Sequence, residues 1–243
     1  MEQGRAICAL TMGRYTTAYT SLLARLVEVE ILRKHAADQE RTDPVQNRHE
    51  VNALCRGAIV LLCAHLEAFI RELGDVALGR LYERAVPRRK LAPQLYYYMS
   101  KDILDEVKDT SQPTKLADKL FWFLDNDAAM WGRKGPLPGP VPAERFNKGF
   151  ASPAYKKIQR YFKRFGYSGY RNDLAVILKG DYSTTTNMVD HLVDIRNKIA
   201  HGDTTATETP ADIKEMVHIV RRFCAVSDGA FASWFKREMC CIR

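Results

Sequence analysis

Three polar side chains near the carboxyl end of the chain are spaced so that they could act together on a phosphodiester. They are Arg196, Asn197 and His201, in the segment RNKIAH. An imidazole takes up and releases protons near neutrality, so His201 is a candidate general base or acid. The planar guanidinium of Arg196 matches a phosphate and could stabilise the extra charge of a pentacoordinate transition state. With Asn197 holding the imidazole or a phosphate oxygen, the pattern favours RNA cleavage that needs no metal.

The same segment also has a purely structural interpretation. An arginine five residues before a histidine arises easily by chance in a chain with six histidines. The segment could be an ordinary helix end, with a solvated histidine, a capping Gly202 and an arginine paired with Asp190 or Asp194. Asp190, Asp194 and Asp203 could also be imagined as a magnesium cluster. A motif with its own arginine and histidine does not require one, so we expect neither a metal nor another cofactor.

A helix must position these groups. At about 100° per residue, the segment separates into an apolar row and a polar row on opposite faces. The apolar row contains Met188, Leu192, Ile195 and Ile199, and the polar row contains Asp190, Asp194, Asn197 and His201. Arg196 falls at the seam between them. We expect Asp194 to support the site and Lys198 to contact RNA. Thr185 or Thr186 should cap this helix, which should end at His201.

Glu67 is an acidic residue in the middle of a long apolar helical run, beside His65 and one turn before Arg71. Packed against the motif, it could orient Arg196 or His201. It could equally form only a helical ion pair with Arg71.

A basic stretch precedes the motif, with no acidic residue between positions 145 and 171. One helical face would carry Lys156, Arg160, Lys163 and Arg164, and the other Tyr155, Ile158, Phe162 and Phe165. The interleaved Tyr161, Tyr167 and Tyr170 could stack on unpaired bases. A charge run is usually a solvated face. Both this interpretation and binding of the RNA backbone by the four basic residues stay open.

Helical periodicity dominates the chain and no alternating strand pattern occurs, so the fold class should be all-α, a helical bundle. We expect helices over 15–37, 46–84, 92–108, 115–127, 153–165 and 172–178, then the motif helix. A last helix should begin at Thr209-Pro210, with a kink near Asp228-Gly229. The sequence suggests a single domain over 1–243, with 87–142 as an insertion that ends in a Gly- and Pro-rich break.

Composition narrows the class of protein and its partners. With 243 residues the chain can build one large domain, and its net charge of +8 favours anionic partners such as nucleic acid. None of the six cysteines forms a CxxC pair, which indicates reduced thiols rather than a disulfide frame or zinc site; they are Cys8, Cys55, Cys63, Cys224, Cys240 and Cys241. The most apolar run, 58–64, is too short to span a bilayer, and the start lacks a signal-peptide pattern. We therefore expect a cytoplasmic protein without a membrane partner.

The string RNKIAHGD resembles the HEPN superfamily (higher eukaryotes and prokaryotes nucleotide-binding), whose ribonucleases carry an Arg, usually a polar residue after it, and a His at this spacing. It is particularly similar to bacterial RiboL-PSP-type HEPN proteins. The segment LLCAHLEAFIREL (61–73) and the run from FKRFGY to the motif fit the same resemblance. The likeness covers 52–73 and 152–203, whereas 87–142 resembles nothing that we can name.

The resemblance implies a HEPN-like helical domain that forms a homodimer with two facing RNxxxH motifs and a composite site. RNA would be cut by its own 2′-OH, leaving a 2′,3′-cyclic phosphate and a 5′-OH. Arg196 and His201 would be catalytic and Asn197 supporting. Some HEPN toxins paired with nucleotidyltransferase antitoxins have a Tyr two residues after the His. Asp203 stands there in this chain, which puts control through such a tyrosine in doubt.

Three functions are compatible with these observations. The first is an endoribonuclease that acts as a toxin or antiphage-defence effector, with an antitoxin or defence-system partner. The second is a non-catalytic HEPN-like module that binds RNA or a nucleotide for regulation. The third is a structural helical partner of a neighbouring effector.

Overall fold

The structure is a computed structural model, and it describes residues 14–203 and 208–243. Within these ranges the chain is all-α, with helices and turns but no strand, as the sequence predicts. The helices are α2 (Thr17–Thr42), α3 (Arg48–Glu83), α4 (Pro93–Met99), α5 (Lys101–Lys108), α6 (Pro113–Asn126), α7 (Ala143–Asn147), α8 (Tyr155–Arg164), α9 (Tyr170–Leu178), α10 (Tyr182–Ala200) and α11 (Pro210–Glu238). Short 3-10 turns lie at η1 (Arg88–Lys90), η2 (Ala128–Trp131) and η3 (Lys179–Asp181). Cys8 lies outside the described residues.

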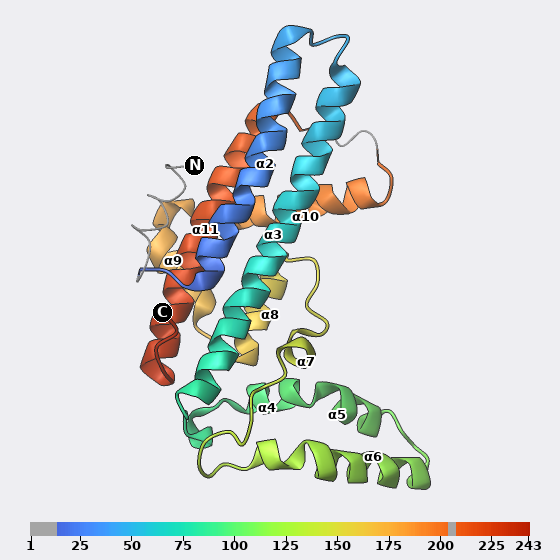
Figure 1. Cartoon of the computed structure of the whole chain (residues 1–243), viewed down its shortest axis with the longest axis vertical. Helices are drawn as coiled ribbons and strands as arrows, with labels where there is room; N and C mark the ends of the chain where they lie inside the picture. The colour runs from blue at the N-terminus through green and yellow to red at the C-terminus, as the bar shows by residue number, and fades with distance from the viewer. Residues whose placement is uncertain (1–13, 204–207) are drawn as a thin grey trace.

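Three long helices form the scaffold. The chain reverses after α2 because Pro44 cannot continue the helix and the Asp43 carboxylate accepts hydrogen bonds from the N–H groups of Val45 and Gln46, both at 3.0 Å. α3 therefore returns antiparallel to α2, and α11 packs along both. α10 crosses α3 on the side away from α2, which sets the motif helix against the middle of the bundle (Figure 1).

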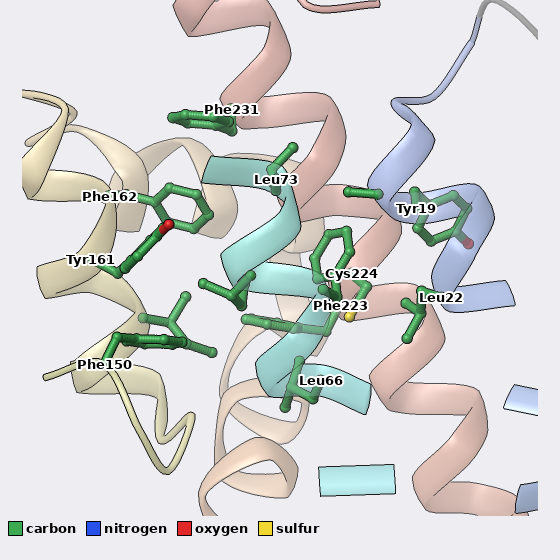
Figure 2. Close-up of a cluster of buried hydrophobic side chains, with 14 of the residues drawn as sticks. Tyr19, Leu22, Leu66, Leu73, Phe150, Tyr161, Phe162, Phe223, Cys224 and Phe231 are labelled. Carbon is green, nitrogen blue, oxygen red and sulfur yellow. The ribbon is translucent and has the colours of Figure 1, made fainter. Parts of the chain in front are cut away.

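The core lies where α2, α3, α8 and α11 meet (Figure 2). α3 buries residues at helical spacing, including Leu62, Leu66, Phe69 and Leu73. Rings from α8 and α11 continue this core; the centroids of Phe162 and Phe231, for example, lie 4.9 Å apart.

The three tyrosines expected to stack on bases belong to this core. Tyr161, Tyr167 and Tyr170 are each at most 1% exposed, so that expectation is wrong. Their rings pack inward, and each hydroxyl has an internal partner: Asn147 for Tyr161, Asp173 for Tyr167 and Ser227 for Tyr170. Buried tyrosine is tolerated because these partners replace water.

α3 is long and apolar enough to cross a membrane when judged by length and composition alone. The run 58–64 is only part of it. Half of its most apolar stretch is buried inside the bundle. The core helix of a soluble protein has these same properties, so the length of α3 is weak evidence for a membrane span.

Two predicted boundaries are wrong. The expected helix over 92–108 divides at Ser100, which is buried and whose hydroxyl accepts a hydrogen bond from the Trp131 indole at 3.0 Å. The motif helix begins at Tyr182, directly after η3, so neither Thr185 nor Thr186 caps it. Both threonines are buried inside its first turns, and the Thr186 hydroxyl donates to the Tyr182 carbonyl at 3.0 Å.

The beginning of α11 is confirmed. Thr209 and Asp212 exchange hydrogen bonds in a capping box, with Pro210 as the first helical residue. The helix then continues through Asp228 and Gly229 to its end.

Residues 88–131 form an arm that projects from the carboxyl end of α3, with α5 and α6 lying side by side (Figure 1). Arg88 closes the base of this arm by donating to the carbonyls of Ala129 at 2.7 Å and Lys134. Asp127, which is buried, receives two hydrogen bonds from Arg145 at 3.0 and 2.7 Å. The arm lies within 87–142, whose status as an insertion stays a prediction.

Candidate active site

The motif helix α10 ends in a glycine cap that fixes His201. Gly202 has φ +83°, a conformation that glycine adopts without a Cβ penalty. Its N–H donates to the Ile199 carbonyl and the Asp203 N–H to the Lys198 carbonyl, both at 3.0 Å, which is a Schellman motif. His201 is the last residue before this turn, and its side chain is exposed. The predicted helix end is confirmed.

Arg196 is half-buried and borders a cavity of about 550 Å³ between α3 and α10. Its guanidinium lies beside the Cys63 thiol on α3. Burial raises the pKa of Cys63, and the hydrogen bond and charge of Arg196 oppose that rise. Among residues 14–203 and 208–243, no Asp or Glu forms an ion pair with Arg196. The alternative in which Arg196 pairs with Asp190 or Asp194 is therefore wrong.

The carboxylates that line this cavity bind other groups instead. Glu67 Oε2 accepts from the Ser152 N–H at 2.9 Å, Asp75 Oδ1 from the Asn147 amide at 2.7 Å, and Glu72 pairs with Arg25. Burial raises the pKa of Asp75, and its hydrogen bond with Asn147 opposes that rise. The positive charge of Arg196 is thus left facing the cavity.

Glu67 forms the helical ion pair with Arg71 that the sequence allowed, and it also binds the loop before α8. Its side chain is 22% exposed, and its Oε1 is 3.7 Å from Arg71 Nε, too long for a strong pair. Its hydrogen bond to Ser152, where φ is +60°, holds the loop before α8 against α3. Glu67 lies beside Cys63, whose pKa its charge helps to raise, so it borders the Arg196 site without binding Arg196.

The polar row of α10 is divided between two tasks. Asp190 accepts a hydrogen bond from the Tyr155 N–H at 2.7 Å, so it caps the start of α8. Asp194 is exposed and Asn197 half-buried, and their side chains form no hydrogen bond with Arg196 or His201 in the described part of the chain. Asp190 therefore has a structural task, whereas Asp194, Asn197 and His201 are the members of the row that a substrate could contact.

Three of the four predicted basic residues of α8 are exposed: Lys156, Arg160 and Lys163. Lys198 on α10 is also exposed. Arg164 is 7% exposed, so its predicted contact with RNA is wrong. Its guanidinium donates to the carbonyl of Lys148 at 3.3 Å and lies 4.3 Å from the Tyr98 ring centroid.

Sequence reasoning missed two residues of the site, Cys63 and Arg71. Cys63, Glu67 and Arg71 follow one another at intervals of four, which places them on one face of α3. Arg71 lines the same cavity as Arg196 and donates to the Phe150 carbonyl at 2.9 Å. Their four-residue spacing in the sequence could have indicated that Cys63 and Arg71 share a helix face with Glu67. The cavity thus has two guanidinium groups on its wall.

Helix geometry separates the two motif side chains. Five residues correspond to about 140° around the axis and about 7.5 Å along it. One copy therefore directs Arg196 toward α3 and His201 toward the open end of the helix. Across residues 14–203 and 208–243, no group of three His, Cys, Asp or Glu side chains is arranged to hold a metal.

Comparison with known families identifies the domain. The RiboL-PSP-HEPN family model matches residues 22–233. The chain belongs to the RiboL-PSP-HEPN family. This confirms the resemblance carried by RNKIAHGD and agrees with the all-α fold. HEPN domains are generally ribonucleases that bind RNA and often dimerise, so membership supports a nuclease or RNA-related role. Searches of curated proteins and of solved structures give no match.

Proposed function

We propose that this protein is a metal-independent endoribonuclease in which Arg196 and His201 act on the scissile phosphate. One observation carries the proposal: the Arg196 guanidinium borders a cavity without a carboxylate partner among the described residues, while His201 is exposed at the capped end of the same helix. A phosphate would supply the missing negative charge. The exposed imidazole is accessible to a substrate proton.

The proposed reaction is an internal transfer. One imidazole removes the proton of the 2′-OH, and the 2′ oxygen forms a bond to phosphorus. The bond from phosphorus to the 5′ oxygen breaks, and the same imidazole, now protonated, supplies the proton that this leaving oxygen takes up. The products are a 2′,3′-cyclic phosphate and a 5′-OH. Arg196 stabilises the transition state, Asn197 positions the phosphate or imidazole, and Asp194 supports the motif from the exposed row.

The site is proposed to be completed by a second copy of the chain. Because Arg196 and His201 are directed about 140° apart, one helix end does not bring both onto a single phosphate. Two copies related by a twofold axis set the arginine of one motif beside the histidine of the other. HEPN domains often dimerise, which supports this arrangement.

The proposed RNA path uses exposed cations near the cavity. α8 begins three residues after Ser152, which the cavity-lining Glu67 holds. Lys156, Arg160 and Lys163 can therefore bind the phosphates of RNA that enters beside Arg196, and Lys198 does so from α10. In the cell we propose a toxin or antiphage-defence effector, cytoplasmic and controlled by an antitoxin or defence-system partner.

Cleavage of labelled RNA in EDTA tests the chemistry. We expect His201→Ala to lower the rate by roughly 10²- to 10⁴-fold and Arg196→Ala by roughly 10²- to 10³-fold. Arg196→Lys, which keeps the charge but not the fork, should recover only part of the rate. His191→Ala is the matched control, because His191 is an exposed histidine of the same helix.

The outcomes separate the functions. Cleavage that requires an added divalent metal, or that His201→Ala leaves intact, would contradict the proposal. RNA binding without cleavage, equal in all variants, would identify the non-catalytic RNA-binding module. Absence of any RNA interaction would leave the structural-partner interpretation.

Mixing two inactive variants tests the composite site. A heterodimer of His201→Ala and Arg196→Ala retains one intact pair of groups. After mixing in equal amounts, half the dimers are mixed and each has one of two sites, so about a quarter of the wild-type rate should return. A mixture as inactive as its components, with subunit exchange verified, would contradict a site shared in this way.

A further inference from the structure

α6 carries an unpartnered apolar face. None of its fourteen residues is buried. Ala117, Leu120, Phe121 and Leu124 recur at helical spacing and are all exposed, Phe121 to 64% and Leu124 to 59%. We call these four residues the α6 stripe. The helix contacts α5 through a different side, where Lys119 pairs with Glu106 at 3.0 Å. The stripe therefore faces away from the arm's own packing.

The surroundings of the stripe are acidic. Asp118 and Asp125 each follow a stripe residue, lie seven positions apart on one flank, and are exposed without an ion pair among the described residues. Residues 101–127 contain seven Asp or Glu and four Lys or Arg, a net charge of −3 in a chain whose total is +8. Arg88, Arg89 and Lys90 at the base of the arm balance this charge, so the excess of acid belongs to the part that carries α5 and α6. It differs in sign from the basic surface of α8.

The charge decides which occupant fits. Phosphates of RNA or of lipid would be repelled by the Asp flank. A twofold contact between two copies through α6 would set the same acidic flank against itself. A helix with an apolar row and basic flanks would cover the stripe and pair with Asp118 and Asp125. An exposed apolar row of this kind on a soluble domain marks an interaction site.

We propose that the α6 stripe is the docking surface for a partner protein that presents an amphipathic helix flanked by Lys or Arg. The interaction is separate from RNA cleavage, because the arm contributes neither Arg196 nor His201. It assigns residues 101–127 the task of recognising a protein.

The test uses the full chain and a fluorescein-labelled peptide of three heptads, with Leu at the two core positions and Lys at the flanking positions. A matched peptide carries Glu in place of Lys. We expect the Lys peptide to bind and the Glu peptide not to bind, as measured by fluorescence anisotropy. A protein of net charge +8 repels a basic peptide overall, so binding would report a local acidic, apolar surface.

Two arm variants and one control locate the binding. Phe121→Ser with Leu124→Ser should weaken binding of the Lys peptide by roughly tenfold or more. Asp118→Lys with Asp125→Lys should reverse the preference toward the Glu peptide. Val176→Ser, at a 72% exposed apolar residue of α9, should leave binding unchanged. All substituted side chains are exposed, so we expect unchanged circular dichroism and unchanged RNA cleavage without peptide.

Three results would overturn the proposal. The first is no binding of the Lys peptide, or binding that the arm variants do not weaken. The second is a dimer that dissociates in sedimentation velocity when Phe121 and Leu124 are replaced, which would make the stripe an interface between copies. The third is loss of RNA binding in the same variant, which would make the arm an RNA platform.

Discussion

Replacing Gly202 with alanine would show how far the helix cap controls the site. Gly202 has φ +83°, and a Cβ added there would meet no atom within 4 Å. The added methyl group of Gly202→Ala therefore causes no steric clash that would destabilise the folded state. What remains is the strain of placing an L-residue in left-handed backbone, about 1–2 kcal/mol.

The strain should appear both in stability and in cleavage. We expect urea unfolding of Gly202→Ala to give a free energy of unfolding lower by about 1 kcal/mol. If His201 is placed by the cap, unwinding of the last turn should also lower kcat by roughly 5- to 30-fold, the factor that corresponds to 1–2 kcal/mol. Gly202→Asn should lose less, since asparagine tolerates this backbone region better than alanine.

Gly180→Ala is the matched control. A Cβ there also meets no atom within 4 Å, and the φ of Gly180 lies outside the left-handed range. We expect unchanged or slightly increased stability and unchanged cleavage. If Gly202→Ala equals the wild type in both measurements, the cap does not hold the helix end. If stability falls while kcat stays the same, the cap exists but does not position His201.

Three further substitutions test the scaffold. Gly74→Ala should lower the melting temperature through a cost of about 1–3 kcal/mol, since its Cβ would lie 1.9 Å from the buried Tyr161 hydroxyl oxygen; an unchanged melting temperature would refute this packing. Asp190→Ala should lower the free energy of unfolding by about 1–2 kcal/mol, because the hydrogen bond from the Tyr155 N–H at the start of α8 is lost. The control Asp194→Ala, at an exposed residue, should change it little. Equal effects of the two substitutions would argue against a capping role of Asp190. Burial raises the pKa of Asp228 above its ordinary 3.8, so the folded state holds that proton more tightly. Stability of the wild type relative to Asp228→Asn should therefore be greatest below pH 3.8 and fall as pH rises through the raised pKa, and a difference independent of pH in urea unfolding would contradict this.

Features set by local sequence were predictable. The end of α10 depends on a glycine and the four residues before it, and the start of α11 on Thr209, Pro210 and Asp212; the structure has both where the sequence indicated. The all-α class followed from periodicity for the same reason. Each of these signals acts between residues a few positions apart.

Features set by distant contacts were not predictable. Arg164 looked like part of a basic face, but its burial depends on Tyr98 and on carbonyls of the preceding loop. The break at Ser100 depends on Trp131, thirty-one positions away. Asp190 appeared to belong to an open polar row until its contact with the start of α8 was known. A single sequence shows which residues are charged, but not which of them another helix covers.

The contact between Arg196 and Cys63 has a consequence for what the cavity attracts. Burial raises the pKa of Cys63, so at neutral pH the sulfur beneath the guanidinium is an uncharged thiol. Had a carboxylate occupied that place, an incoming anion would first have to displace it. With a thiol there, an anion that enters does not compete with a negative charge at position 63. Cys63→Asp would place such a charge beside Arg196 without altering any residue of the RNxxxH motif.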